Sequence, residues 1–174
     1  MTNFLNLSNL PEINFKAKGK PQIEELSRYI DNLKTSLFSD SWSQLTKKHI
    51  KTSMVLYIRQ MQKQLAPMGA HYRAVDIKGK QHLEHVIPQN KIVNAYLHDK
   101  ITSELMLQMP LCLIADADKH LLEGEWQLTG DWNYPFRRYK LAGFNKKIKD
   151  VTGKFIDLDS YSIQDHFDML GVSF

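Results

Sequence analysis

The spacing of the apolar residues changes at Pro67, and this change constrains the fold more than any other feature of the sequence. Before Pro67, apolar residues recur at steps of three and four. This spacing predicts one amphipathic helix from Pro21 to Leu37 and a second that is capped within residues 39–41 and ends near Ala66. After Pro67 the apolar segments are short and are separated by glycine or proline, as in strands and short helices. The sequence therefore predicts an α+β protein.

The segments after Pro67 predict a sheet with short helices around it. Residues 71–77 and 81–87 flank Lys78-Gly79-Lys80 and predict a β-hairpin. Helical spacing from Ile92 to Leu105 predicts one helix, and the apolar segment 111–115 predicts a buried strand. Asp116 is expected to cap the next helix. We expect residues 130–144 to be irregular, 147–158 to form a hairpin about Thr152-Gly153, and 162–170 to form a closing helix.

Composition restricts the class of protein. The 174 residues include 23 Lys+Arg and 19 Asp+Glu, so a polyanionic partner is permitted. Cys112 is the only cysteine, which rules out an intramolecular disulfide. The apolar runs are far shorter than the roughly 20 residues of a membrane-spanning helix, and no basic segment leads into an apolar one. We therefore expect no membrane association and a cytoplasmic location. Motifs of covalent hydrolases, kinases and dehydrogenases do not occur.

The residues that best indicate chemistry are Glu84-His85-Val86-Ile87-Pro88, at the end of a predicted strand, and His120, in the helix after the next strand. An imidazole can take a proton from water near neutral pH. A carboxylate and a second imidazole can hold a divalent cation that stabilises a negatively charged transition state. A hydrolytic nuclease needs these groups.

At these residues the sequence resembles the HNH, or ββα-metal, endonuclease superfamily. The resemblance implies that His85 is the general base and that Glu84 and His120 bind the metal, most simply Mg²⁺, with Mn²⁺ or another transition metal as alternatives. Leu111-Cys112-Leu113-Ile114, followed by Asp116, is similar to the second strand and helix start of the family. The paired cysteines that hold a structural zinc in some members do not occur here.

A second segment, Tyr134-Pro135-Phe136-Arg137-Arg138-Tyr139 with Ala142-Gly143, resembles the Pro-x-x-Arg-Tyr-x-x-Ala-Gly segment of small bacterial and phage HNH-like proteins. The resemblance predicts three parts in one compact domain. Residues 1–67 would form an arm and a helical pair, residues 68–145 an HNH-like core on which that pair packs, and residues 146–174 a small hairpin and helix.

Two features depart from the family pattern. Its central asparagine has no clear counterpart, since Asn90 comes early and residue 108 is a glutamine. The connection between the two strands, residues 88–110, is long enough to contain a helix. Residues expected to support the site are Asn90, Gln108, Asp116, Glu123 and His82. Contacts to nucleic acid, DNA in the first place, are expected from Lys78, Lys80, Arg137 and Arg138.

Other interpretations stay open on the sequence alone. Side chains alternate along a strand, so His82 and Glu84 share one face and His85 lies on the other, where a histidine is more often structural than catalytic. The main prediction is a metal-dependent endonuclease that hydrolyses phosphodiester bonds. The alternative is a non-catalytic module on an HNH-like scaffold that binds nucleic acid or protein, as in a mobile element or a phage defence system. The N-terminal helices could also form a homodimer or bind a protein partner.

Overall fold

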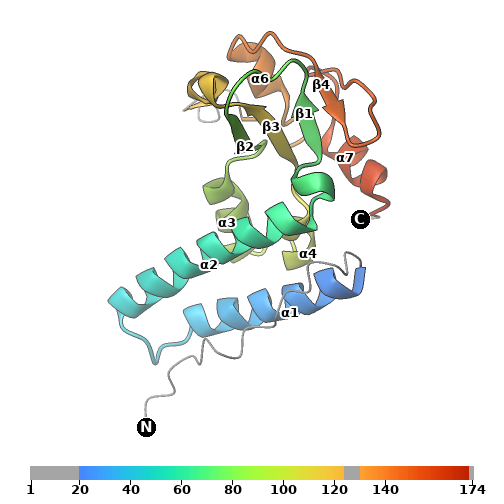
Figure 1. Cartoon of the computed structure of the whole chain (residues 1–174). Helices are drawn as coiled ribbons and strands as arrows, with labels where there is room; N and C mark the ends of the chain where they lie inside the picture. The colour runs from blue at the N-terminus through green and yellow to red at the C-terminus, as the bar shows by residue number, and fades with distance from the viewer. Residues whose placement is uncertain (1–19, 124–129, 173–174) are drawn as a thin grey trace.

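The computed structural model describes residues 20–123 and 130–172 (Figure 1), and their fold is α+β, as predicted. Of the predicted arm, residues 1–20, all but Lys20 lie outside the described residues, and Lys20 begins the first helix. In chain order the elements are α1 (Lys20–Leu37), α2 (Gln44–Leu65), the 3₁₀ helix η2 (Pro67–Gly69), β1 (Tyr72–Ala74), β2 (Gln81–His85), α3 (Gln89–Leu97), α4 (Ser103–Leu107), β3 (Leu111–Ala115), the 3₁₀ helix η3 (Asp116–Leu122), α6 (Arg137–Leu141), β4 (Ile148–Asp150) and α7 (Ile163–Leu170).

The two predicted N-terminal helices are confirmed, with one correction at the start of α2. Ser43 caps this helix, because its hydroxyl accepts a hydrogen bond from the backbone N–H of Thr46 at 3.2 Å. The polar residues 39–41, predicted as the cap, lie in the preceding turn instead. The apolar side of α1 is buried in the core, where Leu26 and Ile30 pack against residues of α2, α3 and α4.

The prediction of one helix from Ile92 to Leu105 is wrong, because α3 and α4 are separate helices. Asp99 interrupts the pattern with a positive φ of 57°, a left-handed conformation that a continuing helix excludes. Thr102 then caps α4 by accepting from the backbone N–H of Leu105 at 3.2 Å. Apolar spacing continues across this break, so periodicity alone did not reveal it.

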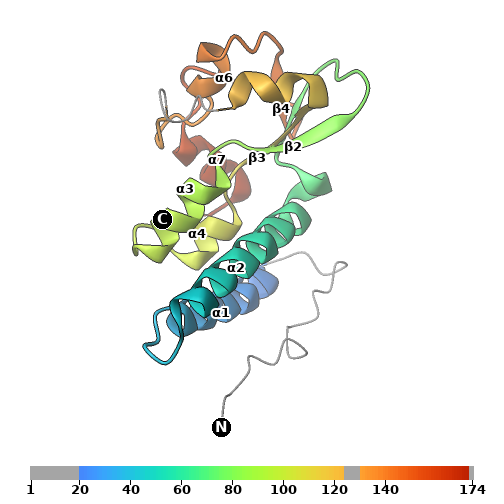
Figure 2. The same ribbon diagram turned by 90° about the vertical axis from the view of Figure 1, so that its left-hand side faces the viewer.

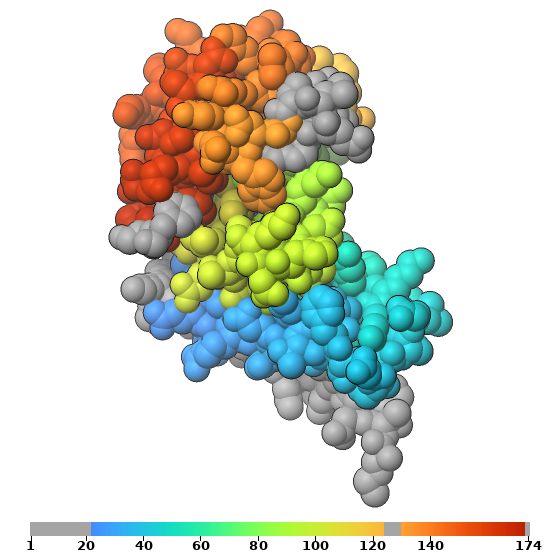
Figure 3. Space-filling model, turned by 180° about the vertical axis from the view of Figure 1, so that it is seen from behind, coloured from blue at the N-terminus to red at the C-terminus, as the bar shows by residue number. Residues whose placement is uncertain are grey.

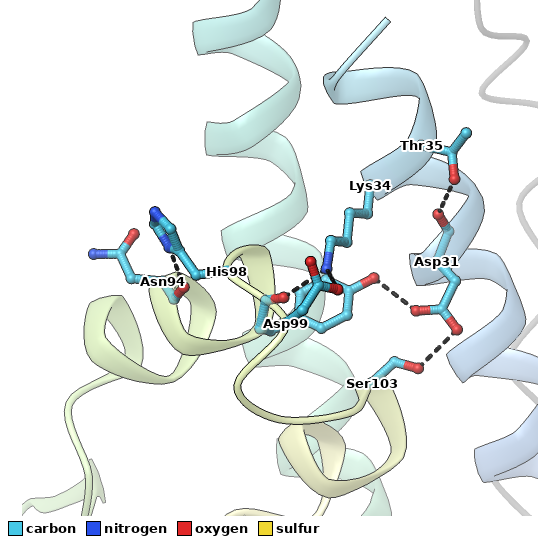
Figure 4. A network of polar contacts seen from close by, with 8 residues as sticks. Asp31, Lys34, Thr35, Asn94, His98, Asp99 and Ser103 are labelled. Atoms are coloured by element: carbon cyan, nitrogen blue, oxygen red, sulfur yellow. Dashed lines mark hydrogen bonds and ion pairs between the residues drawn. The ribbon is translucent and has the colours of Figure 1, made fainter.

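Polar contacts from α1 hold the turn between α3 and α4 in place (Figure 4). The Lys34 ammonium donates to the Tyr96 carbonyl at 2.7 Å and to the Asp99 carboxylate at 2.6 Å. The Asp31 carboxylate accepts from the Tyr96 hydroxyl at 2.7 Å and from the Ser103 hydroxyl at 2.9 Å. The connection between β2 and β3 is thus bound to the N-terminal helical pair.

The predicted hairpin between residues 71 and 87 is wrong, because β3 lies between its two strands. The sheet has the order β2-β3-β1-β4, with β3 parallel to β1 and antiparallel to β2. The apolar segment of β3 is buried on both faces apart from a half-buried Leu113, which suits a central strand. The predicted strand 111–115 is therefore confirmed, but its neighbours could not be deduced from its composition.

The C-terminal hairpin and helix are confirmed. Strand β4 turns at Thr152-Gly153, where Gly153 has a φ of 89°, and Lys149 forms an antiparallel bridge with Phe155. Ser162 and Asp165 form a reciprocal cap at the start of α7. The expected irregular segment 130–144 contains the short helix α6 in its described structure.

The buried residues form two main clusters, one for each layer of the molecule. The first lies among α1, α2, α3 and α4 and includes Phe167 of α7. The second lies between the sheet and α6, where Tyr72, Phe136 and Tyr139 pack together. Figure 2 shows α6 and α7 on the same side of the sheet, and Figure 3 shows this half of the molecule above α3 and α1. Among the described helices, none is long and apolar enough to cross a lipid bilayer.

Candidate functional site

The strand–strand–helix order that the HNH resemblance implies occurs at β2, β3 and η3. Strand β2 pairs with β3 along its whole length, from Gln81 opposite Ala115 to His85 opposite Leu111, and η3 follows β3 directly. The helix is 3₁₀ in its described part, and Asp116 does not cap it, contrary to the prediction. The Asp116 carboxylate lies 3.5 Å from the Lys119 ammonium and 3.9 Å from Nδ1 of His82 instead.

Glu84 forms part of a polar cluster with His82, Asp116 and Arg138, on the face of the sheet that packs against α6. One carboxylate oxygen of Glu84 accepts from the Arg138 guanidinium, and the other lies 3.3 Å from Nε2 of His82. Arg138 is only 2% exposed and also donates to the His85 carbonyl at 2.9 Å. The guanidinium therefore ties the end of β2 to α6 and neutralises the carboxylate that was predicted to bind a metal.

His85 points to the opposite face of the sheet and is buried, with 7% of its surface exposed. Its Nε2 lies 3.1 Å from Oε1 of Gln62, whose amide nitrogen donates to the Met106 carbonyl at 2.6 Å. Since the amide nitrogen is the donor there, Oε1 accepts and the His85 Nε2–H donates. Burial lowers the pKa of His85 to about 4, helped by the positive charges of Arg59 and Arg138, so the ring is neutral near pH 7.

His120 and Glu123 lie apart from this arrangement, on η3 and at its end, and both are exposed. Within residues 20–123 and 130–172, no three His, Cys, Asp or Glu side chains lie where they could hold a metal ion. Glu84 and His85 point to opposite faces of β2, and Glu84 already faces a guanidinium. In this structure Glu84, His85 and His120 do not assemble into a cation site.

Neither Asn90 nor Gln108, both expected to support the site, forms a hydrogen bond with His85 in the described part of the chain. Asn90 is exposed in the first turn of α3, and the Gln108 side chain donates to the Glu104 carbonyl at 3.1 Å. The side chain that orients the His85 ring is Gln62 of α2, which the prediction did not include. The sequence did contain a signal that Gln62 is buried. Gln62 follows Met54 and Ile58 at steps of four and so lies on the buried side of α2.

The four predicted nucleic-acid contacts differ in their exposure. Lys78 and Lys80 are exposed on the loop between β1 and β2. The Arg137 guanidinium is 42% exposed and stacks on Tyr134 with 4.1 Å from Cζ to the ring centroid. Arg138 is buried in the polar cluster, so in this structure it cannot reach a phosphate at the surface.

Two further buried histidines, which the prediction did not include, join α7 to the sheet. Nδ1 of His166 accepts from the Tyr72 hydroxyl at 2.8 Å, and its Nε2–H donates to the Gln108 carbonyl at 2.7 Å. His71 accepts from the backbone N–H of Leu111 at 3.2 Å and packs edge-on against His166. Burial lowers the pKa of His166 to about 4 and that of His71 well below its usual value. Both rings are neutral structural groups.

Comparisons of the chain with protein families, with curated proteins and with solved structures find no match.

The buried neutral histidines predict that the protein loses stability in acid. The pKa values of His85 and His166 fall from 6.5 to about 4 on folding, so the unfolded chain takes up these protons first as the pH decreases. Their contribution is complete above about pH 6.5 and is lost towards pH 4, by roughly 3 kcal/mol for each ring. Urea unfolding between pH 7.5 and 4 measures this loss. His166→Gln should flatten the profile, and the exposed control His49→Gln should not; equal profiles for both variants would refute the assignment.

The polar cluster predicts unequal roles for two adjacent arginines. Arg138→Met leaves the Glu84 carboxylate without its buried partner and should lower the free energy of unfolding by about 3 kcal/mol or more. Arg137→Met removes a partly exposed pair with Asp131 and a hydrogen bond from Nε to the Asp159 carbonyl at 2.7 Å, and should cost about 1–2 kcal/mol. Urea denaturation of the two variants tests this difference. Equal losses would show that the ion pair with Glu84 does not hold α6 on the sheet.

Proposed function

We propose that the protein binds nucleic acid through exposed cations of its sheet layer and does not cleave it. The observation that carries this proposal is the use of the predicted catalytic side chains in structural contacts. The Glu84 carboxylate faces Arg138, and His85 is buried against Gln62. Because these side chains are engaged within the protein, we assign nucleic-acid binding to the exposed basic residues around the sheet.

The available cations lie on β1, on the loop between β1 and β2, and on β4 or directly before it. Arg73, Lys78, Lys80 and Lys147 are exposed, and Lys149 is half-buried. Within the described part of the chain, none of them forms an ion pair with a carboxylate, whereas Lys34, Lys119, Lys140 and Lys146 do. Ammonium and guanidinium groups that are not neutralised by the protein itself are suited to phosphate contacts.

Binding of fluorescein-labelled DNA and RNA, followed by anisotropy at several salt concentrations, tests the proposal. We expect the affinity to fall steeply with salt and to be the same with and without a chelator, because the interaction is with phosphate charges. Lys78→Ala and Lys80→Ala should each reduce the dependence of log K on log salt by roughly one. Lys48→Ala is the control, because Lys48 is exposed on α2 and its substitution removes the same charge outside the proposed surface. Binding that is absent at low salt, or that requires a divalent cation, would contradict the proposal.

A metal-dependent endonuclease is the second candidate, and the strand–strand–helix order of β2, β3 and η3 favours it. In this proposal His85 would take the proton from the attacking water, with Glu84 and His120 as the residues that the resemblance assigns to a divalent cation. The His85 ring would first have to leave its contact with Gln62, since it is buried in the structure described. Active protein would therefore require a change of conformation at the end of α2.

Nicking of supercoiled plasmid with Mg²⁺ or Mn²⁺ distinguishes the two candidates. The binding proposal expects no nicking beyond that of a buffer control, from protein whose folding is verified by circular dichroism. The endonuclease would give nicking that a chelator abolishes and that His85→Gln reduces by about a hundredfold or more, the usual effect of removing a general base. Nicking that survives in His85→Gln would assign the activity to a contaminant or to another site.

A further inference from the structure

We infer that an unpaired nucleic-acid strand binds across the face of the sheet that points away from α6. The surface is a row of five side chains, one from each neighbouring strand segment: Leu83, Leu113, Arg73, Lys149 and Phe155. We call it the sheet row. The inference rests on the proposed function, and it adds the class of nucleic acid and the surface that binds it.

The register of the sheet places these five residues side by side. Leu83 pairs with Leu113 between β2 and β3, and Leu113 is the partner of Arg73 across the parallel pair of β3 and β1. Arg73 pairs with Lys149 of β4, which in turn bridges to Phe155. Directly paired residues project to the same face of a sheet. With the usual strand spacing, the row is about 19 Å long.

The sheet row lies on the face away from α6 and α7. The neighbouring row, which contains Cys112 and Tyr72, projects to the other face and is buried in the cluster with Phe136 and Tyr139. Arg73 is exposed and Phe155 is 50% exposed, whereas Leu83 and Leu113 are half-buried because they pack against Ala66 and Ala70, which follow the end of α2. In Figure 2, α6 and α7 lie on the same side of the sheet. The chain enters the sheet through η2, which connects the end of α2 to β1.

The row offers partners for both parts of a nucleotide. The ammonium groups of Lys149 and of Lys147, two residues earlier, lie over the Phe155 ring at 4.7 Å and 5.4 Å from its centroid, so the ring and both cations are within reach of one nucleotide, whose base would take the place of an ammonium group on the ring. Phosphates would contact these cations and Arg73, while a base stacks on the exposed ring. A depression of about 630 Å³ beside Arg73 and Lys149 extends this surface towards Met68.

The aromatic and aliphatic members of the row favour an unpaired strand over a duplex. In a duplex the faces of the bases are stacked on one another, so only the phosphates are available to a flat surface. In a single strand the bases can contact Phe155, Leu113 and Leu83 at the same time as the phosphates contact the cations. Four-stranded sheets that bind RNA stack roughly two or three bases in this way.

Anisotropy with a labelled 20-nucleotide oligo-dT, its RNA equivalent oligo-U, and a 20-base-pair duplex tests the inference. The parent protein should bind the single strands at least about fivefold more tightly than the duplex. Phe155→Ala should remove about fivefold or more of the affinity for single strands, and Phe155→Tyr, which keeps a ring, should bind like the parent. Phe38→Ala is the matched control, because Phe38 is a similarly exposed phenylalanine after α1, at 59% against 50% for Phe155. Preference between oligo-dT and oligo-U tells whether DNA or RNA is bound.

Three outcomes would decide against the inference. If Phe155→Ala binds single strands as Phe38→Ala does, the ring is not a stacking platform. If the parent binds duplex as tightly as single strands and only the Lys78 and Lys80 variants weaken it, the proposed function stands and the sheet row is not the binding surface. If no nucleic acid binds to folded protein, the proposed function and this inference both fail.

Discussion

The position of β3 between β1 and β2 is the constraint on which the rest of the structure depends. Because β3 is parallel to β1, the chain cannot connect these strands by a tight turn and instead passes through β2, α3 and α4. This connection is bound to the N-terminal helices through Asp31 and Lys34. The helical layer and the sheet layer are therefore parts of one arrangement, and the helical pair supports the connection between two strands of the sheet.

Buried polar contacts join the two layers at the ends of the strands. Gln62 connects α2 to β2 and α4, and His166 connects α7 to β1 and to the end of α4. Within the sheet layer, Arg138 connects α6 to β2 on the opposite face. In each case a polar group that would be costly to bury alone has a partner from another element, so the contacts specify which elements meet. The same contacts account for the burial of His85, which the sequence presents as a candidate base.

Much of the fold could be predicted from periodicity, whereas the candidate site could not. The helices α1, α2 and α7 and the strand β3 have clear apolar patterns, and glycine marks the turn of the C-terminal hairpin. The break at Asp99 leaves the apolar spacing unchanged, and Lys34 of α1 contacts the chain there. The motif Glu84-His85 predicts two neighbouring functional groups, but the alternation of a strand sends them to opposite faces. Their partners, Arg138 and Gln62, come from segments more than 20 residues away.

The sequence by itself determined the α+β class, the amphipathic helices α1, α2 and α7 and the turn of the C-terminal hairpin, because these depend on the order of neighbouring residues. The tertiary structure decided which strands pair, which histidines are buried and which cations are left without a carboxylate. These properties depend on contacts between segments that are distant in the chain. The sheet row illustrates the difference: Leu83, Leu113, Arg73, Lys149 and Phe155 share no pattern in the sequence, and only the register of the sheet brings them together.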